Sequence, residues 1–213
     1  MGCSVGFWRF SSDSHSLASH APRCRSFQSS PAVVDGTVYT GCRDSNLYAI
    51  DAATGKEKWR FNNNGSWVIT SPAVTQGKVF FATSDSALYH VLDAATGKSV
   101  LQQEDKAYMF SSPAIAGDVV LVGVTNGTLE ARDIVSGELL WDFRTEASKQ
   151  NRSWILTADR KFNNSFLFRT SWQAPSIDAT HRMLRVGSVF SSPLASGSTV
   201  YFGSTDGNLY AIE

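Results

Sequence analysis

One repeated pattern constrains the fold of this chain more than any other feature of its sequence. A Ser-Pro step opens a short apolar run four times, at Pro31, Pro72, Pro113 and Pro193. The first three prolines lie 41 residues apart, and the fourth follows after 80 residues, close to two periods. An Asp or Asn comes thirteen residues after each proline (Asp44, Asp85, Asn126, Asp206), and a Leu comes sixteen residues after it (Leu47, Leu88, Leu129, Leu209). This recurrence indicates one structural unit used repeatedly.

The clearest copy of the unit, residues 29–61, predicts four short strands joined by three tight turns. Alternating apolar and polar residues at 38–40 and 46–50 predict a central hairpin. Asn126-Gly127 and Asp206-Gly207 predict two-residue hairpin turns of primed type in later copies, because Asn, Asp and Gly tolerate positive φ.

A period of about 40 residues with four strands per unit is typical of a propeller blade. We therefore predict an all-β protein: a β-propeller of about five four-stranded blades, one of them degenerate, or part of a longer propeller. The expected blades are residues 29–71, 72–112, 113–152, 153–190 (degenerate) and 191–213 (incomplete).

A second recurring motif carries a family resemblance. The pattern Ala49-x-Asp51-x-x-Thr54-Gly55-Lys56-x-x-Trp59 follows a Leu-Tyr strand, and it returns in altered form from Ala131 to Trp141. It resembles the tryptophan-docking motif of the pyrroloquinoline-quinone (PQQ)-like β-propeller repeat family, and the chain is most similar to its BamB-like branch. The resemblance covers residues 29–144 and 189–213. It implies that Trp59 and Trp141 pack between blades.

Residues 1–28 form an irregular N-terminal segment in which no secretory signal peptide is recognisable. Within it, residues 6–10 (Gly-Phe-Trp-Arg-Phe) resemble the fourth strand of the first unit, 58–61. The last unit ends after its third strand. We therefore expect residues 7–10 to pair with the strand at 208–212 and close the ring, which would remove exposed sheet edges.

Residues 145–188 depart from the repeat. We expect a short helix or extended connection at 145–158 and strands at 166–170 and 182–186, and we favour a degenerate blade over a loop inserted between blades. Aromatic and Arg side chains in this segment either fill a gap in the core or bind a protein partner. The candidate partner-binding residues are Trp154, Arg160, Phe166 and Trp172.

No catalytic, cofactor-binding or metal-binding motif is recognisable. Asp51, Asp93 and Asp133 recur in the same turn, where Asp caps backbone N–H groups, so we assign them to the unit and not to catalysis. We place His90 at the strand position of Ala49 and expect it to be a strand residue, not a ligand. Lys and Arg together equal Asp and Glu at 19 each, which argues against nucleic-acid binding, and no run is long or apolar enough to span a membrane.

The function expected from the resemblance is a non-catalytic scaffold that binds a protein partner, in the cell envelope and in envelope protein assembly. The family suggests an extracytoplasmic location. The alternative is a fragment or relative of a PQQ-dependent quinoprotein dehydrogenase, which would hold quinone and Ca²⁺ on the propeller axis. Such enzymes have more blades and, in many cases, a pair of adjacent cysteines, whereas Cys3, Cys24 and Cys42 are separated.

Overall fold

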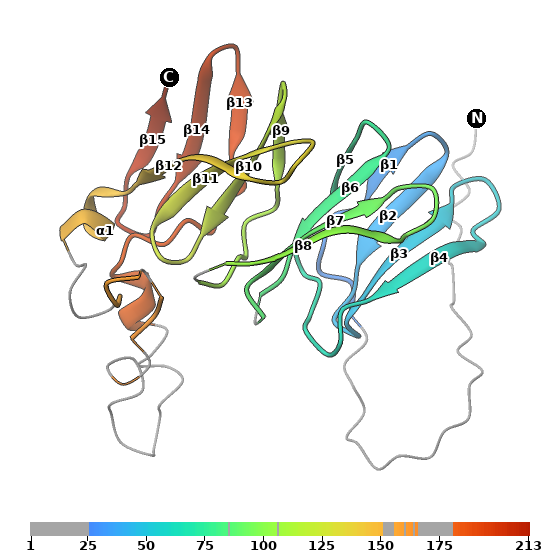
Figure 1. Ribbon diagram of the computed structural model, residues 1–213, viewed down its shortest axis with the longest axis horizontal. Coiled ribbons are helices and arrows are strands. Elements are labelled where there is room, and N and C mark those ends of the chain that lie inside the picture. Colours follow the sequence, from blue (N-terminus) through green and yellow to red (C-terminus); the bar gives the residue numbers. More distant parts are fainter. Residues whose placement is uncertain are drawn as a thin grey trace, which may run out of the picture.

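The computed structural model describes residues 26–84, 86–105, 107–150, 156–159, 161–163, 165 and 181–213. The strands of this part of the chain form four antiparallel sheets in chain order (Figure 1). The first sheet comprises β1 (Ala32–Val34), β2 (Thr37–Gly41), β3 (Asn46–Asp51) and β4 (Glu57–Asn62). The second comprises β5 (Ala73–Thr75), β6 (Lys78–Ala82), β7 (Leu88–Asp93) and β8 (Ser99–Glu104). The third comprises β9 (Ala114–Ala116), β10 (Val119–Val124), β11 (Thr128–Asp133) and β12 (Leu139–Arg144). The last comprises β13 (Leu194–Ser196), β14 (Thr199–Gly203) and β15 (Leu209–Ile212), which confirms the all-β prediction.

Each sheet is a meander in which every strand pairs with its neighbour in sequence. Asp35-Gly36 joins β1 to β2 with φ angles of 47° and 69°, the pair of positive angles of a type I′ turn. The predicted primed turns at Asn126-Gly127 and Asp206-Gly207 differ from this, because only the glycine has positive φ, at 80° and 86°. These two loops are longer than two residues, and in such loops the positive angle falls on the residue that re-enters the sheet.

The sheets follow one another through their inner strands β1, β5, β9 and β13. One hydrogen bond repeats at each step. The main-chain N–H of Ser30 donates to Ser71 Oγ at 2.8 Å, that of Ser71 to Ser112 Oγ at 2.8 Å, and that of Ser112 to Ser192 Oγ at 3.3 Å. Because the same contact recurs, successive sheets are related by a common step, as propeller blades are. We call this row of contacts the serine ladder.

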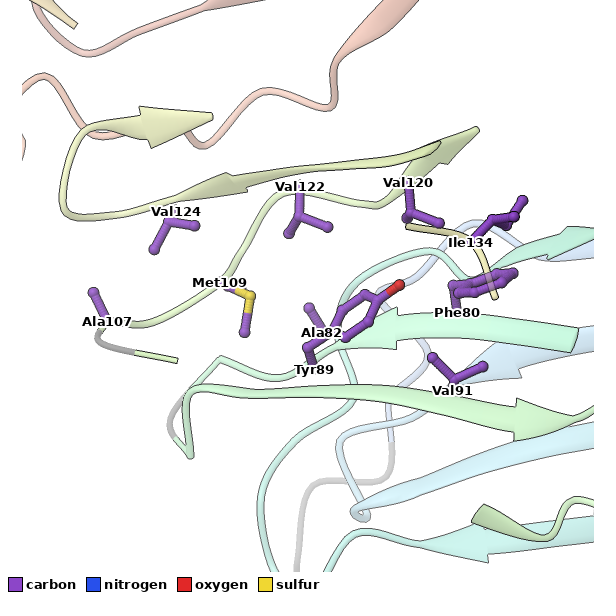
Figure 2. Close-up of a cluster of buried hydrophobic side chains, with 10 residues drawn as sticks. All are labelled: Phe80, Ala82, Tyr89, Val91, Ala107, Met109, Val120, Val122, Val124 and Ile134. Atoms are coloured by element: carbon purple, nitrogen blue, oxygen red, sulfur yellow. The ribbon is translucent and has the colours of Figure 1, made fainter. Parts of the chain in front are cut away.

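The hydrophobic core lies between the sheets. We call the face that a sheet turns toward the next sheet its forward face, and the opposite face its rear face. Figure 2 shows Val120 and Val122 on the rear face of β10 pointing toward Phe80 and Tyr89 on the forward face of the second sheet, while Val124 lies near Ala107 and Met109. Similar clusters join the first sheet to the second and the third to the last. Each sheet thus buries its apolar faces only by stacking on its neighbours.

The last sheet packs directly against the third, through β13 on β9 and through Phe143 against Phe202 and Tyr210. The structure therefore differs from the predicted degenerate blade at 153–190, because the described residues form no sheet between these two. The second half of the 80-residue gap is an insertion. It begins with α1 (Glu146–Gln150), and its return at His181–Leu184 is helical, not the strand expected at 182–186. The strand expected at 166–170 lies outside the described residues.

Candidate interaction surface at the open end of the array

The insertion leaves and re-enters the array at one point. Thr145 Oγ1 lies 3.1 Å from the main-chain oxygen of Gly187 and 3.3 Å from that of Val186. Close by, the Ser188 hydroxyl donates to the main-chain oxygen of Thr125 at 2.5 Å. A small cluster of Leu156, Val186, Phe162 and Met183 forms the base of the insertion. The predicted partner-binding residues Trp154, Arg160, Phe166 and Trp172, which belong to this insertion, lie outside the described residues.

The recurring aspartates Asp51, Asp93 and Asp133 stabilise the same turn, each in its own repeat unit. Asp51 Oδ1 accepts hydrogen bonds from the main-chain N–H groups of Ala53 and Thr54 at 3.2 and 2.8 Å. Asp133 accepts the corresponding pair in its own turn, and Asp93 accepts from the main-chain N–H of Thr96 at 2.8 Å. Hydrogen bonds from Thr54 lower the pKa of Asp51, so the carboxylate stays charged and capped. The assignment of these residues to the unit is supported by their geometry.

The docking role predicted for Trp59 is confirmed. Its indole Nε1 donates to the main-chain oxygen of Ala94 at 3.0 Å, in the turn that follows β7. A Cβ on Gly97, which has a φ of 69°, would lie 2.6 Å from the Trp59 ring. Leu101 of the second sheet approaches Gly137 of the third sheet in the same way. A glycine in this turn thus allows the aromatic or aliphatic side chain of the preceding sheet to dock.

Trp141 holds the corresponding position in the third sheet, but it docks against no turn in the described part of the chain and is 42% exposed. Beside it lies a groove of about 340 Å³ between the outer parts of the third and last sheets. Its walls are formed by Trp141, Asp142, Phe143, Ser198, Val200, Ile212 and Glu213. The groove occurs at the outer edge of β15, where the other sheets have a fourth strand.

The forward face of the last sheet is exposed. Leu194, Tyr201 and Leu209 are 64%, 39% and 76% exposed. The strand registers place Tyr201 in the position of Phe80, and Leu209 in the position of Tyr89, and both of these residues are fully buried under the third sheet. The forward face of the last sheet is therefore a blade-packing surface that no described residue covers.

A buried charged cluster between the second and third sheets is the feature that sequence reasoning missed. Arg132 Nη2 contacts Asp105 Oδ2 at 2.7 Å and Glu130 Oε2 at 2.5 Å, with all three side chains at most 6% exposed. Arg132 Nη1 also donates to Gln103 Oε1 at 2.7 Å. Burial and the neighbouring Asp105 carboxylate raise the pKa of Glu130 to about 7. This cluster joins two sheets, and each of its charged groups has a partner, as buried charges require.

His90 also lies between sheets, but not at the predicted position. It pairs with Phe81, as Tyr48 pairs with Thr40, so its structural counterpart is Tyr48 and not Ala49. The second sheet has one extra residue in the loop before β7, which shifts the register. The His90 ring stacks on Phe81 at 4.7 Å, and neither ring nitrogen has a hydrogen-bond partner among the described residues. Burial lowers the pKa of His90 to about 4, so the ring is neutral at pH 7.

Among the described residues, no three His, Cys, Asp or Glu side chains come close enough together to hold a metal ion. The helices in that same part of the chain are too short and too polar to cross a membrane. The described residues form three surfaces: the groove beside Trp141, the forward face of the last sheet, and the base of the insertion.

Comparison with solved structures shows the fold. BamB from Moraxella catarrhalis matches with a TM-score of 0.61 and 20% identity, over 87% of this chain and 46% of BamB. The computationally designed protein Ika4 matches with a TM-score of 0.62 and 17% identity, over 92% of this chain and 94% of Ika4. A quinohemoprotein alcohol dehydrogenase from Comamonas testosteroni matches with a TM-score of 0.59 and 21% identity, over 84% of this chain and 29% of the enzyme. The chain thus spans about half the length of BamB.

No curated protein sequence matches the chain. A family model described as "outer membrane protein assembly factor BamB" matches residues 6–213, nearly the whole sequence. The repeated four-stranded sheets, the docked Trp59 and this match agree. The chain therefore belongs to the BamB-like family of β-propeller repeat proteins.

Proposed function

We propose that this protein is a non-catalytic scaffold that binds protein partners in the cell envelope, outside the cytoplasm, during the assembly of envelope proteins. Family membership supports the general role, because the family is described as an outer membrane protein assembly factor. The structural observation that carries the proposal is the insertion after Thr145. Its two ends are held together against the array, and this supports the proposal because a recognition segment between them would leave the stacked sheets undisturbed.

The partner-binding residues in this proposal are Trp154, Arg160, Phe166 and Trp172. Trp and Arg are the residue types that contribute most to binding energy at protein interfaces, and this segment departs from the repeat. Residues that depart from a repeat are free to serve a partner, whereas Asp51 and its counterparts are used by the turns.

The test is affinity capture of partners from solubilised outer-membrane proteins with the full chain, quantified by mass spectrometry. The variant carries Trp154→Ala and Trp172→Ala, and the matched control carries Val100→Ala, an exposed apolar residue of β8. We expect the double variant to lose at least about tenfold of the captured partner, since two anchor residues are truncated. The control retains it. Equal capture by all three proteins would contradict the proposed binding residues.

The competing function is quinone-dependent dehydrogenation, because a quinohemoprotein alcohol dehydrogenase shares the fold. A ligand that binds only the folded protein raises its melting temperature. Addition of pyrroloquinoline quinone with Ca²⁺ should leave the melting temperature of this protein unchanged. A rise that requires both compounds would overturn the non-catalytic proposal.

A further inference from the structure

We propose that Arg43 and Trp67 form a second partner-binding position, which takes an acidic side chain next to an apolar one in an extended segment of a protein partner. Arg43 lies in the loop between β2 and β3, and Trp67 lies in the loop between β4 and β5. The inference rests on the proposed role of the protein as a scaffold, but it uses residues outside the insertion.

Arg43 is an exception to the repeat. The strand registers assign a small hydroxyl residue to the same position in each of the other described sheets: Ser84, Thr125 and Thr205. The main chain makes the contact that recurs at this position. Arg43 N–H donates to the oxygen of Ser26 at 3.0 Å, as Thr125 N–H donates to the oxygen of Tyr108 at 3.0 Å. The repeat unit therefore does not require the Arg43 side chain, and such a residue is free to serve a partner.

The Arg43 guanidinium is stacked on an aromatic ring, but no acidic side chain neutralises it. Its Cζ lies 3.7 Å from the ring centroid of Trp67. Among the described residues it forms no ion pair, and its Nε is buried without a hydrogen-bond partner. The carboxylate of the adjacent Asp44 accepts instead from the Tyr48 hydroxyl at 2.7 Å and from Asn46 N–H at 3.0 Å. A stacked guanidinium keeps its terminal N–H groups in the ring plane, where they match a carboxylate.

Trp67 is held in place by its own loop. The Asn63 side-chain Nδ2 donates to the main-chain oxygen of Ser66 at 3.2 Å, and Ser66 N–H donates to the oxygen of Asn63 at 3.1 Å. Asn64 and Gly65 turn the chain with φ angles of 48° and 98°. Asn63 and Ser66 are buried, whereas Trp67 beside them is 42% exposed. The loop thus fixes a large aromatic side chain at the surface.

The next loop of the same kind shows how this position can be used. Tyr108 and Trp67 each lie five residues before the Pro of a Ser-Pro step. Phe162, from the base of the insertion, packs against Tyr108 with 5.8 Å between ring centroids. An aromatic residue at this position therefore already receives an apolar side chain from outside the sheets. At Trp67, an apolar side chain of the partner would take that place while its acidic neighbour contacts Arg43.

The charges favour a protein segment over a phosphate-bearing surface. Anionic lipids and nucleic acids are bound by groups of Lys and Arg side chains. Here Arg43 is followed by Asp44, and Arg60 on the same sheet is already paired with Glu57 at 2.8 Å. A single Arg beside an exposed Trp is instead a combination that contributes strongly to binding at protein interfaces.

The test is selection of random linear peptides, displayed on phage, for binding to the full chain, with Arg43→Ser for counter-selection. Serine is the residue of the second sheet at this position, and the Nε that is removed has no described partner. The variant should therefore fold, as circular dichroism would verify. We expect the peptides that bind only the wild type to share an Asp or Glu next to an apolar residue.

The affinity of the most enriched peptide, synthesised and measured by fluorescence anisotropy, tests the two residues separately. Binding should weaken at least about tenfold in Arg43→Ser and in Trp67→Ala, because a charge-assisted contact and an aromatic contact are lost. The matched control is Arg60→Ser, which removes an Arg that already has an acidic partner and should keep the wild-type affinity.

Replacement of the acid in the peptide by its amide identifies the contact. The amide peptide should bind the wild type at least about tenfold more weakly, and Arg43→Ser should add no further loss, because both changes remove the same pair. The capture experiment with the insertion variant concerns other residues, so either result can fail without the other.

Four results would contradict the proposal. No peptide distinguishes the wild type from Arg43→Ser, the preferred peptides lack an acid, or Arg60→Ser weakens binding as much as Arg43→Ser does. The fourth is a lipid site, shown by phosphatidylglycerol vesicles that sediment with the wild type but not with Arg43→Ser.

Discussion

The indole Nε1 of Trp59 donates a hydrogen bond of 3.0 Å to the main-chain oxygen of Ala94, 35 residues further along the chain and in the next sheet. The hydroxyl of Tyr39 lies 3.2 Å from the same oxygen. Two aromatic side chains of one sheet thus converge on one turn of the next, at Gly97. This contact ties the order of the repeat in sequence to the order of the sheets in space.

Replacement of Trp59 by Ala should lower the free energy of unfolding by about 3 kcal/mol, because a large aromatic and its hydrogen bond are lost from an interface. Urea unfolding followed by circular dichroism would measure this. Trp141→Ala is the matched control: its side chain is 42% exposed and docks on no described turn, so its loss should be about 1 kcal/mol. Equal losses for the two variants would contradict the docking role of Trp59.

His90 should make the protein less stable in acid. Burial lowers its pKa from 6.5 to about 4, so below pH 6.5 the unfolded chain takes up a proton that the folded chain does not. The stability contributed by neutral His90 is therefore present above pH 6.5 and falls as the pH decreases toward 4. His90→Phe should remove this fall, and at pH 7 it should stabilise the protein by about 1 kcal/mol, because two buried nitrogens without partners are removed. The control is His181→Gln at an exposed site, which should keep the wild-type profile.

Removal of Arg132 without its two carboxylate partners should strongly lower the free energy of unfolding. Arg132→Met leaves Asp105 and Glu130 as buried carboxylates without their cation and should lower the free energy of unfolding by about 3 to 5 kcal/mol. The interface between the first and second sheets offers a replacement set, since Asn63, His90 and Leu92 hold the corresponding positions there. The triple variant Asp105→Asn, Glu130→His, Arg132→Leu should recover most of that loss in thermal or urea unfolding. A triple variant as unstable as Arg132→Met would show that the sites are not equivalent.

Glu130 should have the opposite pH effect to His90. Its pKa is raised from 4.5 to about 7, so between these values the unfolded chain releases a proton that the folded chain retains. The contribution of Glu130 is therefore complete below pH 4.5 and decreases as the pH rises through 7. Glu130→Gln should flatten this part of the stability profile, measured by urea unfolding at a series of pH values. Glu138→Gln, an exposed site, provides the control. An unchanged slope in Glu130→Gln would contradict the assignment.

The sequence predicted the sheets well because the repeat is local. Each Ser-Pro step, turn Asp and docking Trp lies within one unit of about 40 residues, so comparison of units identified them without long-range information. Offsets counted along the sequence identified equivalent residues less reliably than the strand pairing in the structure did. Leu88 lies at the expected offset, but Tyr89 occupies the structural position of Leu47, because the extra residue falls in the loop before β7.

The insertion and the charged cluster could not be predicted in the same way. A gap of 80 residues fits both two blades and one blade with an insertion, and contacts in space such as that of Phe143 with Phe202 distinguish them. Glu130 and Arg132 stand where the first and last units have Tyr and Ile, which marks them as exceptions. Their partner Asp105 is more than twenty residues away, in a different sheet, so sequence alone did not show that the charges meet.

The hydrogen bond from Thr145 to Gly187 holds the two ends of the insertion next to each other. Because the main chain departs and returns at adjacent points, the intervening residues can lengthen, shorten or be exchanged while the angle between the flanking blades stays the same. The inserted residues can therefore change in evolution without rearranging the stacked sheets, and a protein engineer could insert a foreign peptide at the same place.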